Sequence, residues 1–455
     1  MKTLDIFRDK QLTRSLIAIS VPIAMQNLIT YCTSMMDTVM LGQLGEVQLS
    51  GATVANQFTN IFMGLTFGIA SGTNVLLAQY WGKKDVRSIR SILAVMYWTT
   101  LALAAVFFCS ARFFPQEIMR IFTPDQEVIA QGAQYLEIVC WSYWGMGLSN
   151  VMLMSLRSVG TVRISLVVYL SSLFINTGCN WLLIFGNLGF PRLEMRGAAI
   201  ATVLARLVEL SIAAFYIFRL EKKISLRPRD VVAFDRTFIR DFAINVSPVI
   251  LNEFLWSMGN SALMMIMGRM GRAFVTASSI TNITSQFAQI FIIGLSNATS
   301  VIIGNTVGTG DYDRAKSVAK GITIFSVLLG VGAGLIIFLL RPVIVSFYNI
   351  PDSTKEVVLS VMTSASVIVF FQCMAIIELM GILRGGGDVR FVLVCDIIFL
   401  WLCSVPLGTV AGLYLGLPPA IVYLVLKCDE MLKIIAGTYR IFSGKWVKNL
   451  TRQEI

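Results

Sequence analysis

Long apolar segments recur along the whole chain, and they constrain its fold more than any other feature. A helix needs roughly twenty apolar residues to cross a bilayer core, and within lipid every backbone N–H and C=O group must be hydrogen-bonded inside the protein. With 56% hydrophobic and only 14% charged residues, the sequence predicts an all-α, polytopic membrane protein. The twelve predicted spans are about 14–36, 49–80, 92–112, 128–155, 162–186, 196–218, 241–267, 276–306, 318–341, 356–382, 391–414 and 418–440.

The positive charge is concentrated in alternate loops. The chain has 37 Lys and Arg against 26 Asp and Glu. With the N-terminus inside the cell, most of the basic residues fall in cytoplasmic segments, as the positive-inside rule requires. The richest of these segments is RLEKKISLRPRD at 219–230. The placement of these basic residues therefore predicts an orientation in the cell (inner) membrane with both termini cytoplasmic. The net charge of +11 is explained by these loops, so we expect the lipid bilayer as a partner and no nucleic acid.

The N-terminal stretch MKTLDIFRDKQLTR is basic and precedes an apolar run, as the start of a signal peptide does. No small-residue cleavage site follows it, and the first span recurs later in the chain as part of a repeat. We therefore expect this span to remain as the first helix of the mature protein.

The chain consists of two similar halves. At a shift of 226 residues MLGQLG meets IMGRMG, and at a shift of 227 LRSVGTVR (156–163) meets LRGGGDVR (383–390). Six spans is an even number, so both halves enter the membrane in the same orientation, as parallel repeats. We predict an N-terminal lobe at 1–219, a cytoplasmic linker loop at 220–240 and a C-terminal lobe at 241–455. The matched residues include Pro22 and Pro248, Gly45 and Gly271, Gly82 and Gly308, and Asp85 and Asp311.

These features resemble a known family. MDTVMLGQLG at 36–45, its glycine-matched partner MGRMG, NTGCN at 176–180 and the doubled six-helix arrangement are similar to the multidrug and toxic compound extrusion (MATE) family, and NEFLW at 252–256 is similar to its NorM-like branch. The resemblance covers essentially the whole chain. It implies a transporter that exports amphipathic, mostly cationic organic compounds in exchange for Na⁺ or H⁺, with both termini cytoplasmic. We expect a monomer with no cofactor beyond the coupling ion.

Asp37 is the first candidate site residue, because a carboxylate inside a span costs about 2.5–3.5 kcal/mol on insertion scales and is a functional candidate by default. Its repeat partner is Leu263, so the fold does not require an acid there. Asn176 and Asn180 lie four residues apart, on one helical face. One carboxylate with neutral oxygens suits Na⁺ or a shared proton, whereas asparagines that only bridge helices are the alternative. The resemblance implies that these three residues and Thr202 form the first lobe's cation site.

Glu253 and Glu378 are the candidates in the second lobe. Glu253 lies five residues after Pro248 and matches the second-lobe carboxylate of the NorM-like branch. That branch usually has an aspartate in span ten, where this chain has Ala375, and Glu378 follows about one helical turn later. Either Glu378 replaces the aspartate or the second site is incomplete. The chain has no histidine, so proton coupling has to depend on Asp or Glu.

Other charged residues within the spans permit simpler interpretations. Glu137 and Asp396 fit either buried ion pairs or residues of a transport pathway. Pro22 and Pro248 each remove a helix hydrogen bond and mark either bending points or static kinks. The predicted local pairs are Arg206 with Glu209 in span six, and Asp429 and Glu430 with Lys427 and Lys433 in the last span.

Aromatic and methionine side chains are candidates for the wall of a substrate cavity. CWSYWGMGLSNVMLM at 140–154 puts Trp, Tyr, Met, Gly and Ser on one helix. Rings attract cations and thioethers adapt to varied ligands, although ordinary core and lipid-facing packing explains the same composition. The resemblance singles out Tyr143 as a substrate-cavity residue.

Several classes of protein are excluded or disfavoured. Without histidine, HExxH zinc sites and Ser-His-Asp triads cannot form, and no Walker A loop is present to bind ATP. None of the eight cysteines forms CxxC, so neither a zinc site nor a disulfide framework is indicated. GGGD at 385–388 fits the GxGD of intramembrane aspartyl proteases, but it aligns with a turn of the first half. We expect no enzyme. The alternative is a lipid-linked saccharide flippase of the same superfamily, which requires a cationic cavity.

Overall fold

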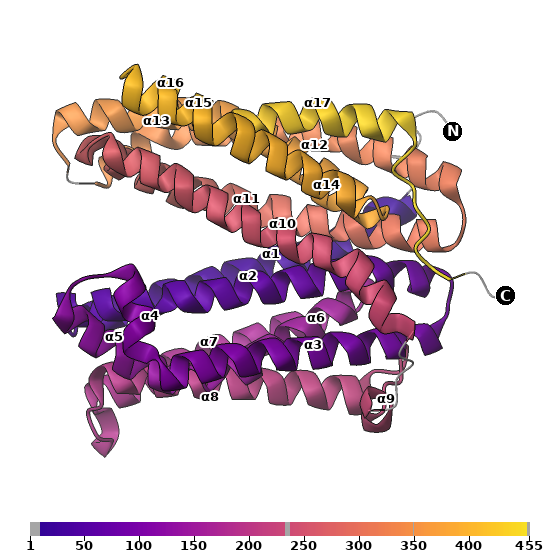
Figure 1. The fold of residues 1–455 in the computed structure, drawn as a ribbon, viewed down its shortest axis with the longest axis horizontal. Coiled ribbons are helices and arrows are strands. Elements are labelled where there is room, and N and C mark those ends of the chain that lie inside the picture. The colour runs from indigo at the N-terminus through magenta and orange to yellow at the C-terminus, as the bar shows by residue number, and fades with distance from the viewer. Residues whose placement is uncertain (1–9, 233–236, 349, 453–455) are drawn as a thin grey trace. The chain divides into compact units, whose positions relative to one another are not determined.

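The computed structural model describes residues 10–232, 237–348 and 350–452, and every regular element in these ranges is a helix (Figure 1). This confirms the predicted all-α class. The labelled helices are α1 (Lys10–Gly42), α2 (Glu46–Gly82), α3 (Val86–Phe113), α4 (Pro115–Phe122), α5 (Gln126–Val139), α6 (Ser142–Ser158), α7 (Arg163–Phe185), α8 (Glu194–Phe215), α9 (Pro228–Val232), α10 (Thr237–Arg269), α11 (Arg272–Gly308), α12 (Tyr312–Ser346), α13 (Asp352–Ala375), α14 (Val389–Asp396), α15 (Val405–Thr409), α16 (Pro419–Leu426) and α17 (Cys428–Ser443).

Several helices continue directly in π-helical turns, which lengthen them without a break. These turns follow α8, α13, α14 and α15, at Tyr216–Leu220, Ile376–Leu383, Ile397–Ser404 and Val410–Tyr414. Nine helical segments of the described residues are long and apolar enough to cross a membrane. The chain is therefore an integral, multi-pass membrane protein, as the hydropathy pattern predicted.

Two of the predicted spans are each divided into two helices. Span four (128–155) is divided into α5 and α6, because around Cys140 the backbone tightens to i→i+3 hydrogen bonds: Trp141 N–H donates to Ile138 and Tyr143 N–H donates to Cys140. Span twelve (418–440) is divided into α16 and α17 at Lys427, whose φ of −116° and ψ of 17° leave the helical region.

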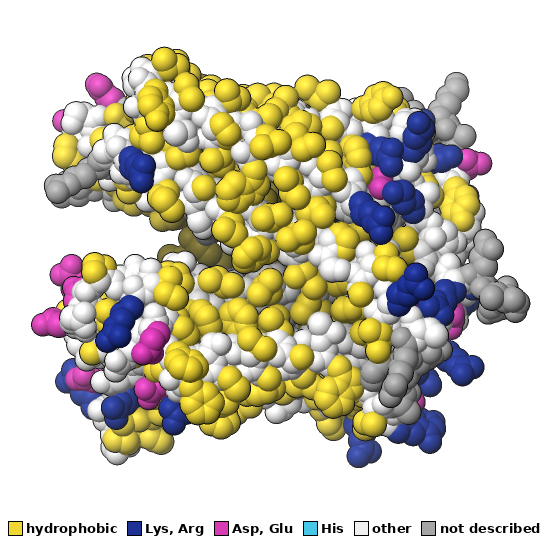
Figure 2. Space-filling model, viewed as in Figure 1, with side chains coloured by type: hydrophobic (Ala, Val, Ile, Leu, Met, Phe, Trp, Pro, Cys, Tyr) yellow, Lys and Arg dark blue, Asp and Glu magenta, His cyan; other side chains and the backbone are white. Residues whose placement is uncertain are grey.

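The outer surface of the helices is apolar. Large hydrophobic side chains such as Val106 on α3 and Leu328, Leu335 and Leu339 on α12 are more than half exposed. Figure 2 shows hydrophobic side chains over the middle of the helices and Lys and Arg toward their ends. An apolar band between polar ends is the surface that a bilayer solvates, with the charged ends at the headgroups.

The chain divides into two compact units. Unit 1 comprises Met1–Ala24, Ala78–Lys84 and Leu251–Ile455, and unit 2 comprises Met25–Leu77 and Asp85–Ile250. α1 and α10 each pass from one unit to the other two residues after a proline, Pro22 or Pro248. Proline removes a helix hydrogen bond, so these are places where a helix bends at low cost. The lobe bounds 1–219 and 241–455 remain a prediction about the sequence repeat.

Small and β-branched residues form the interfaces inside each unit. In unit 1, α13 packs against α11, α12, α16 and α17 and buries Val361, Ala365 and Val369 at four-residue spacing. In unit 2, α8 packs against α5, α6 and α7. A Cβ atom on Gly145 of α6 would lie 2.7 Å from the Arg206 carbonyl oxygen of α8. Only glycine therefore permits α6 and α8 to approach this closely, a common device between membrane helices.

The repeat in the sequence reappears in the backbone. α2 and α11 each have 37 residues. Asp85 caps α3 by accepting a hydrogen bond from Ser88 N–H, and its repeat partner Asp311 caps α12 in the same way. Gly45 and Gly271 both have positive φ, at 142° and 110°, which glycine adopts without strain. Repeated polar and glycine residues thus mark repeated turns and caps.

The predicted linker loop is packed against unit 2 over its first part. The Glu221 carboxylate accepts hydrogen bonds from the N–H groups of Lys223 and Ile224, at 2.8 and 2.7 Å. Arg90 of α3 donates to the Ile224 carbonyl at 2.9 Å, and Trp98 of α3 donates to Val231 at 3.0 Å. Residues 233–236 of this loop lie outside the described ranges.

The C-terminal tail crosses the end of unit 1 and joins it to α2. The Gln79 side chain donates to the Lys448 carbonyl at 3.1 Å and accepts from Leu450 N–H at 2.7 Å. Lys448 N–H donates to the Gly386 carbonyl at 2.8 Å. Trp446 is fully buried and its indole N–H donates to the Ile441 carbonyl at 3.1 Å.

The same tail neutralises the GGGD turn. Asp388 is buried, and its two oxygens accept from Arg440 at 2.7 Å and from Lys448 at 2.5 Å. Both carboxylate oxygens are therefore occupied by cations at a turn before α14. The repeat predicted this turn. Asp388 stabilises it through ion pairs with Arg440 and Lys448.

We expect Trp446→Ala to destabilise the solubilised protein, because loss of a fully buried Trp costs about 3–5 kcal/mol and releases the tail. The melting temperature (Tm) in detergent measures this. Tyr439→Ala is the matched control, since Tyr439 is a 77% exposed aromatic residue on α17. Equal losses of Tm in the two variants would contradict the anchoring role of Trp446.

Candidate functional site

Asp37, Asn180 and Asn176 come together in unit 2. Asp37 lies near the end of α1, and its Oδ1 accepts a hydrogen bond from the Asn180 amide of α7 at 2.5 Å. The same amide lies 3.3 Å from Asn176 Oδ1, one turn earlier on the buried face of α7. The helices therefore meet as the resemblance implied, and the three side chains form a continuous polar cluster inside apolar helices.

Two oxygen atoms of this cluster make it suitable for a small cation. Asn180 Oδ1 is buried and has no hydrogen-bond partner among the described residues, although buried carbonyl oxygens are nearly always paired. Asp37 makes no ion pair with any described residue and has a neutral amide as its hydrogen-bond donor. A carboxylate beside an unpaired carbonyl oxygen is a donor set that suits Na⁺ or a proton.

Thr202 contributes less directly than expected. Its hydroxyl donates to the Ala198 carbonyl of its own helix, α8, at 3.0 Å. Such a bond along the helix is common for threonine. It uses the hydrogen of the hydroxyl group and leaves the lone pairs of the oxygen as acceptors. Membership of Thr202 in the cation site stays a prediction.

Arg206 and Glu209 pair within α8 as their spacing predicted. Arg206 Nη1 lies 2.5 Å from Glu209 Oε1, and the Ser149 hydroxyl of α6 donates to the other Glu209 oxygen at 3.4 Å. Glu209 is only 2% exposed. The hydrogen bond from Ser149 connects this pair to α6. Arg206 also interacts electrostatically with Asp37, although the two residues form no ion pair within contact distance.

Tyr143 lies in the core of unit 2. Its side chain is fully buried, its hydroxyl is 3.2 Å from the Thr59 hydroxyl, and its ring contacts Phe62 and Phe107 at centroid distances of 5.0 and 6.4 Å. The resemblance implied that Tyr143 is a substrate-cavity residue. In the structure it packs among aromatic side chains, and a ligand would reach it only after this cluster opens, so its role in a cavity stays a prediction.

Glu253 has a buried cationic partner that the sequence analysis missed. Its Oε1 lies 2.7 Å from Arg384 Nη1, and Arg384 Nη2 donates to Asn252 Oδ1 at 2.8 Å. The repeat contained a signal for this contact. Arg157, the partner of Arg384 at a shift of 227, donates to Gln26, the partner of Asn252 at a shift of 226, at 2.5 Å.

Glu378 is buried at a different place in unit 1. It lies in the π-helical turns after α13 and is 0% exposed. Its two oxygens are 2.9 and 3.2 Å from the Thr438 hydroxyl of α17. Its partner is thus neutral, as for Asp37. Ala375, where the related branch has an aspartate, is buried at the end of α13.

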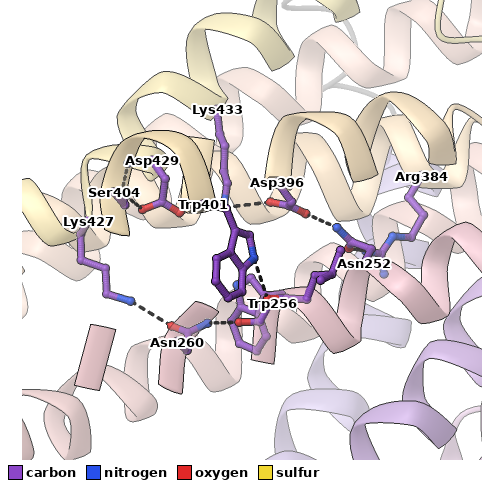
Figure 3. Close-up of polar contacts among 11 residues, drawn as sticks. Asn252, Trp256, Asn260, Arg384, Asp396, Trp401, Ser404, Lys427, Asp429 and Lys433 are labelled. Atoms are coloured by element: carbon purple, nitrogen blue, oxygen red, sulfur yellow. Dashed lines mark hydrogen bonds and ion pairs between the residues drawn. The ribbon is translucent and has the colours of Figure 1, made fainter. Parts of the chain in front are cut away.

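A chain of polar contacts continues from Asn252 across three helices of unit 1 (Figure 3). The Asn252 amide donates to Asp396 Oδ2 at 2.6 Å. Lys433 Nζ lies 2.8 Å from Asp396 Oδ1 and 2.8 Å from Asp429 Oδ2. The i,i+4 pair of Lys433 with Asp429 was predicted, whereas the bridge to Asp396 was left open. Ser404 donates to the remaining Asp429 oxygen at 3.0 Å.

Glu137, for which the sequence left two interpretations, lies at the surface. Its Oε2 lies 3.8 Å from Arg112, and both side chains are nearly half exposed. Pairs of this kind contribute little, about 0–1 kcal/mol. Glu137 therefore belongs to a surface ion pair with Arg112.

Two six-helix repeats with buried charges in their spans define a class of protein, the membrane transporters with parallel repeats. A MatE family model matches residues 22–182 and 248–410, one match in each half. The chain therefore belongs to the MatE family, whose members are transporters and not enzymes.

Relatives of known sequence extend over the whole chain. The chain is 25% identical over 454 residues to the probable multidrug resistance protein NorM of Thermotoga maritima, covering 98% of this chain and 96% of the relative. It is 23% identical to the probable multidrug resistance protein YoeA of Bacillus subtilis, covering 96% and 95%. Both matches include the two halves and all candidate residues lie within the matched length.

Solved structures share the fold. A MATE crystal structure in complex with MaL6 has a TM-score of 0.86 at 16% identity and covers 98% of this chain and 99% of that chain. The eukaryotic MATE transporter AtDTX14 has a TM-score of 0.82 at 17% identity, covering 97% of each chain. At these identities the likeness shows the fold alone.

The buried pair of Glu253 and Arg384 leads to a prediction. Glu253→Gln leaves a buried guanidinium without its counter-ion, and breaking such a pair costs about 3–5 kcal/mol. We expect a clear loss of Tm in Glu253→Gln and in Arg384→Met. The double variant is expected to recover most of it, because both charges are then absent. A loss of Tm in the double variant equal to the sum of the two single losses would contradict the pairing of Glu253 with Arg384.

Proposed function

We propose that this protein is a secondary active efflux transporter, which exports amphipathic, mostly cationic organic compounds in exchange for Na⁺ or H⁺ by alternating access. Membership of the MatE family supports a transport role, and relatives named as probable multidrug resistance proteins support drugs as the cargo. The half-buried carboxylate of Asp37 inside a predicted span supports coupling to a cation.

The cluster of Asp37 with Asn180 is the observation that carries the proposal. The Asp37 carboxylate is held by a neutral amide, and a carbonyl oxygen of the same residue is left without a partner among the described residues. An ionised carboxylate in apolar surroundings is unfavourable until a cation or proton neutralises it. The cluster therefore favours binding of a cation from solution.

Ion binding drives transport only if the two conformations of the protein differ in ion affinity and cargo differs in the opposite sense. When Asp37 is neutralised, Asn176, Asn180 and Thr202 can close around it without an unpaired charge. Closure of these side chains draws α1 toward α7. A movement of α1 in unit 2 is the structural change that we assign to ion binding.

The orientation proposed from the sequence fits the positions of the basic segments. The Lys- and Arg-rich stretches at 83–90, 219–229 and 440–452 fall in loops or the tail that the positive-inside rule assigns to the cytoplasm. We propose a cell-membrane protein with both termini cytoplasmic that acts as a monomer.

Reconstituted transport tests the proposal. Proteoliposomes loaded with a fluorescent organic cation receive an imposed Na⁺ gradient or an imposed pH gradient, one at a time, without nucleotide. We expect dye export with one of the two gradients. Export that requires ATP and ignores both gradients would overturn the proposal. Transport of a lipid-linked saccharide in place of the dye would favour the flippase.

Asp37→Asn is expected to reduce gradient-driven efflux to the level of protein-free liposomes, because a permanently neutral side chain mimics the occupied state. Folding is expected to survive, since the repeat places Leu263 at the matched position. Asp313→Asn is the control, because this fully exposed carboxylate undergoes the same chemical change. Wild-type efflux in Asp37→Asn would refute the coupling role.

A further inference from the structure

Lys433 places an ammonium group between two carboxylates inside unit 1. Its Nζ lies 2.8 Å from Asp396 Oδ1 at the end of α14 and 2.8 Å from Asp429 Oδ2 on α17. The Lys433 side chain is only 4% exposed, and the two aspartates are 9% and 4% exposed. Figure 3 shows Lys433 pointing between the two aspartates. The ammonium is therefore enclosed by protein and held from two helices.

The remaining carboxylate oxygens are also satisfied, so the group has the form of a built cation site. Asp396 Oδ2 accepts from the Asn252 amide at 2.6 Å. Asp429 Oδ1 accepts from the Ser404 hydroxyl at 3.0 Å, and that hydroxyl accepts from Asp429 N–H at 2.9 Å. Each aspartate thus presents one oxygen to the ammonium and is fixed by a neutral donor at the other. Fixed, paired ligands of this kind select one occupant.

The other basic residues near this site have partners of their own, so Lys433 is the cation that pairs with Asp396 and Asp429. Arg384 is already paired with Glu253, and Lys427 donates to the neutral Asn260 at 3.2 Å. Glu430, also buried, adds a further negative charge on α17. Among the described residues of the cluster, the buried ionisable groups are four acids and two bases: Glu253, Asp396, Asp429 and Glu430, with Arg384 and Lys433. Removal of Lys433 therefore creates an uncompensated negative site.

The two units differ in this respect. In unit 2, Asp37 has an amide as its donor and no ion pair among the described residues, whereas in unit 1 Asp396 and Asp429 share an ammonium that the chain itself supplies. We propose that Lys433 is a tethered cation: its ammonium permanently takes the place that an external monovalent cation takes beside Asp37. Resting on the proposed function, this excludes the pair of Asp396 and Asp429 as a second site for the coupling ion.

A lysine that only stabilises the fold and a tethered cation make different predictions for Lys433→Ala. The shortened side chain leaves a cavity between two carboxylates, which a small external cation can enter. A structural lysine gives a loss that no ion restores. A tethered cation gives a loss that methylammonium or Na⁺ restores in a saturable manner, because ligand binding to the folded state raises its stability.

The experiment measures Tm of the full chain in detergent against methylammonium or Na⁺, with choline holding the ionic strength constant. All variants carry Asp37→Asn together with Glu378→Gln, which removes the responses of the two carboxylates whose described hydrogen-bond donors are neutral. With Lys433 present we expect no saturable change. With Lys433→Ala added, we expect a saturable rise of roughly 2–4 °C. The control, with Lys433→Ala, Asp396→Asn and Asp429→Asn added, lacks the carboxylates of this site and is expected to lose this response.

Two results would overturn the proposal. One is a Lys433→Ala protein that folds but shows no saturable, carboxylate-dependent response. The other is a saturable rise of Tm with Na⁺ in Asp37→Asn/Glu378→Gln with Lys433 intact. This measurement needs no lysine variant, so it decides the matter even if Lys433→Ala does not fold. A Tm that responds to Na⁺ in the same way in wild type and in Asp37→Asn would instead count against the proposed coupling at Asp37. The comparison of the Lys433 variants would remain valid.

Discussion

A charge enclosed by helices in a bilayer must be neutralised by other groups of the protein or by a bound ion, because neither lipid nor water is there to solvate it. In this chain that requirement fixes which helices stay together. Arg206 and Glu209 with Ser149 join α8 to α6. Glu253 and Arg384 join α10 to the helix that continues from α13. Ion pairs of this kind are costly to break, so they keep each unit rigid.

The two halves repeat the backbone of one design but not its charges. Helix caps at Asp85 and Asp311 and positive-φ glycines recur at matched positions, because turns and caps depend on a few residue types. The buried charges differ: Arg157 has a neutral Gln26 as its partner, whereas Arg384 has both Asn252 and Glu253. The fold thus tolerates changes of charge that leave its turns intact.

Local patterns in the sequence predicted the helices, the repeat and contacts within one helix, and the i,i+3 pair of Arg206 with Glu209 was confirmed. Contacts between distant segments were harder, because no local spacing encodes them. Asp37 meets Asn180 across 143 residues, and only the resemblance implied this. Arg384 was missed as the partner of Glu253, although its repeat partner marked it. Tyr143 packs in an aromatic cluster, and its place in a substrate cavity, which only the resemblance implied, stays a prediction.

Unequal charge in two similar units has a thermodynamic consequence. An ion shifts a conformational equilibrium only through its different affinities for the two states. In unit 1, Asp396 and Asp429 share the Lys433 ammonium, and Glu253 is paired with Arg384. These three carboxylates already have a cation that the chain supplies. In unit 2, Asp37 accepts from the neutral Asn180 amide, so on the proposed function its counter-ion comes from solution. Two similar units with different charges thus give the proposed coupling ion a carboxylate at which its concentration affects the conformational equilibrium.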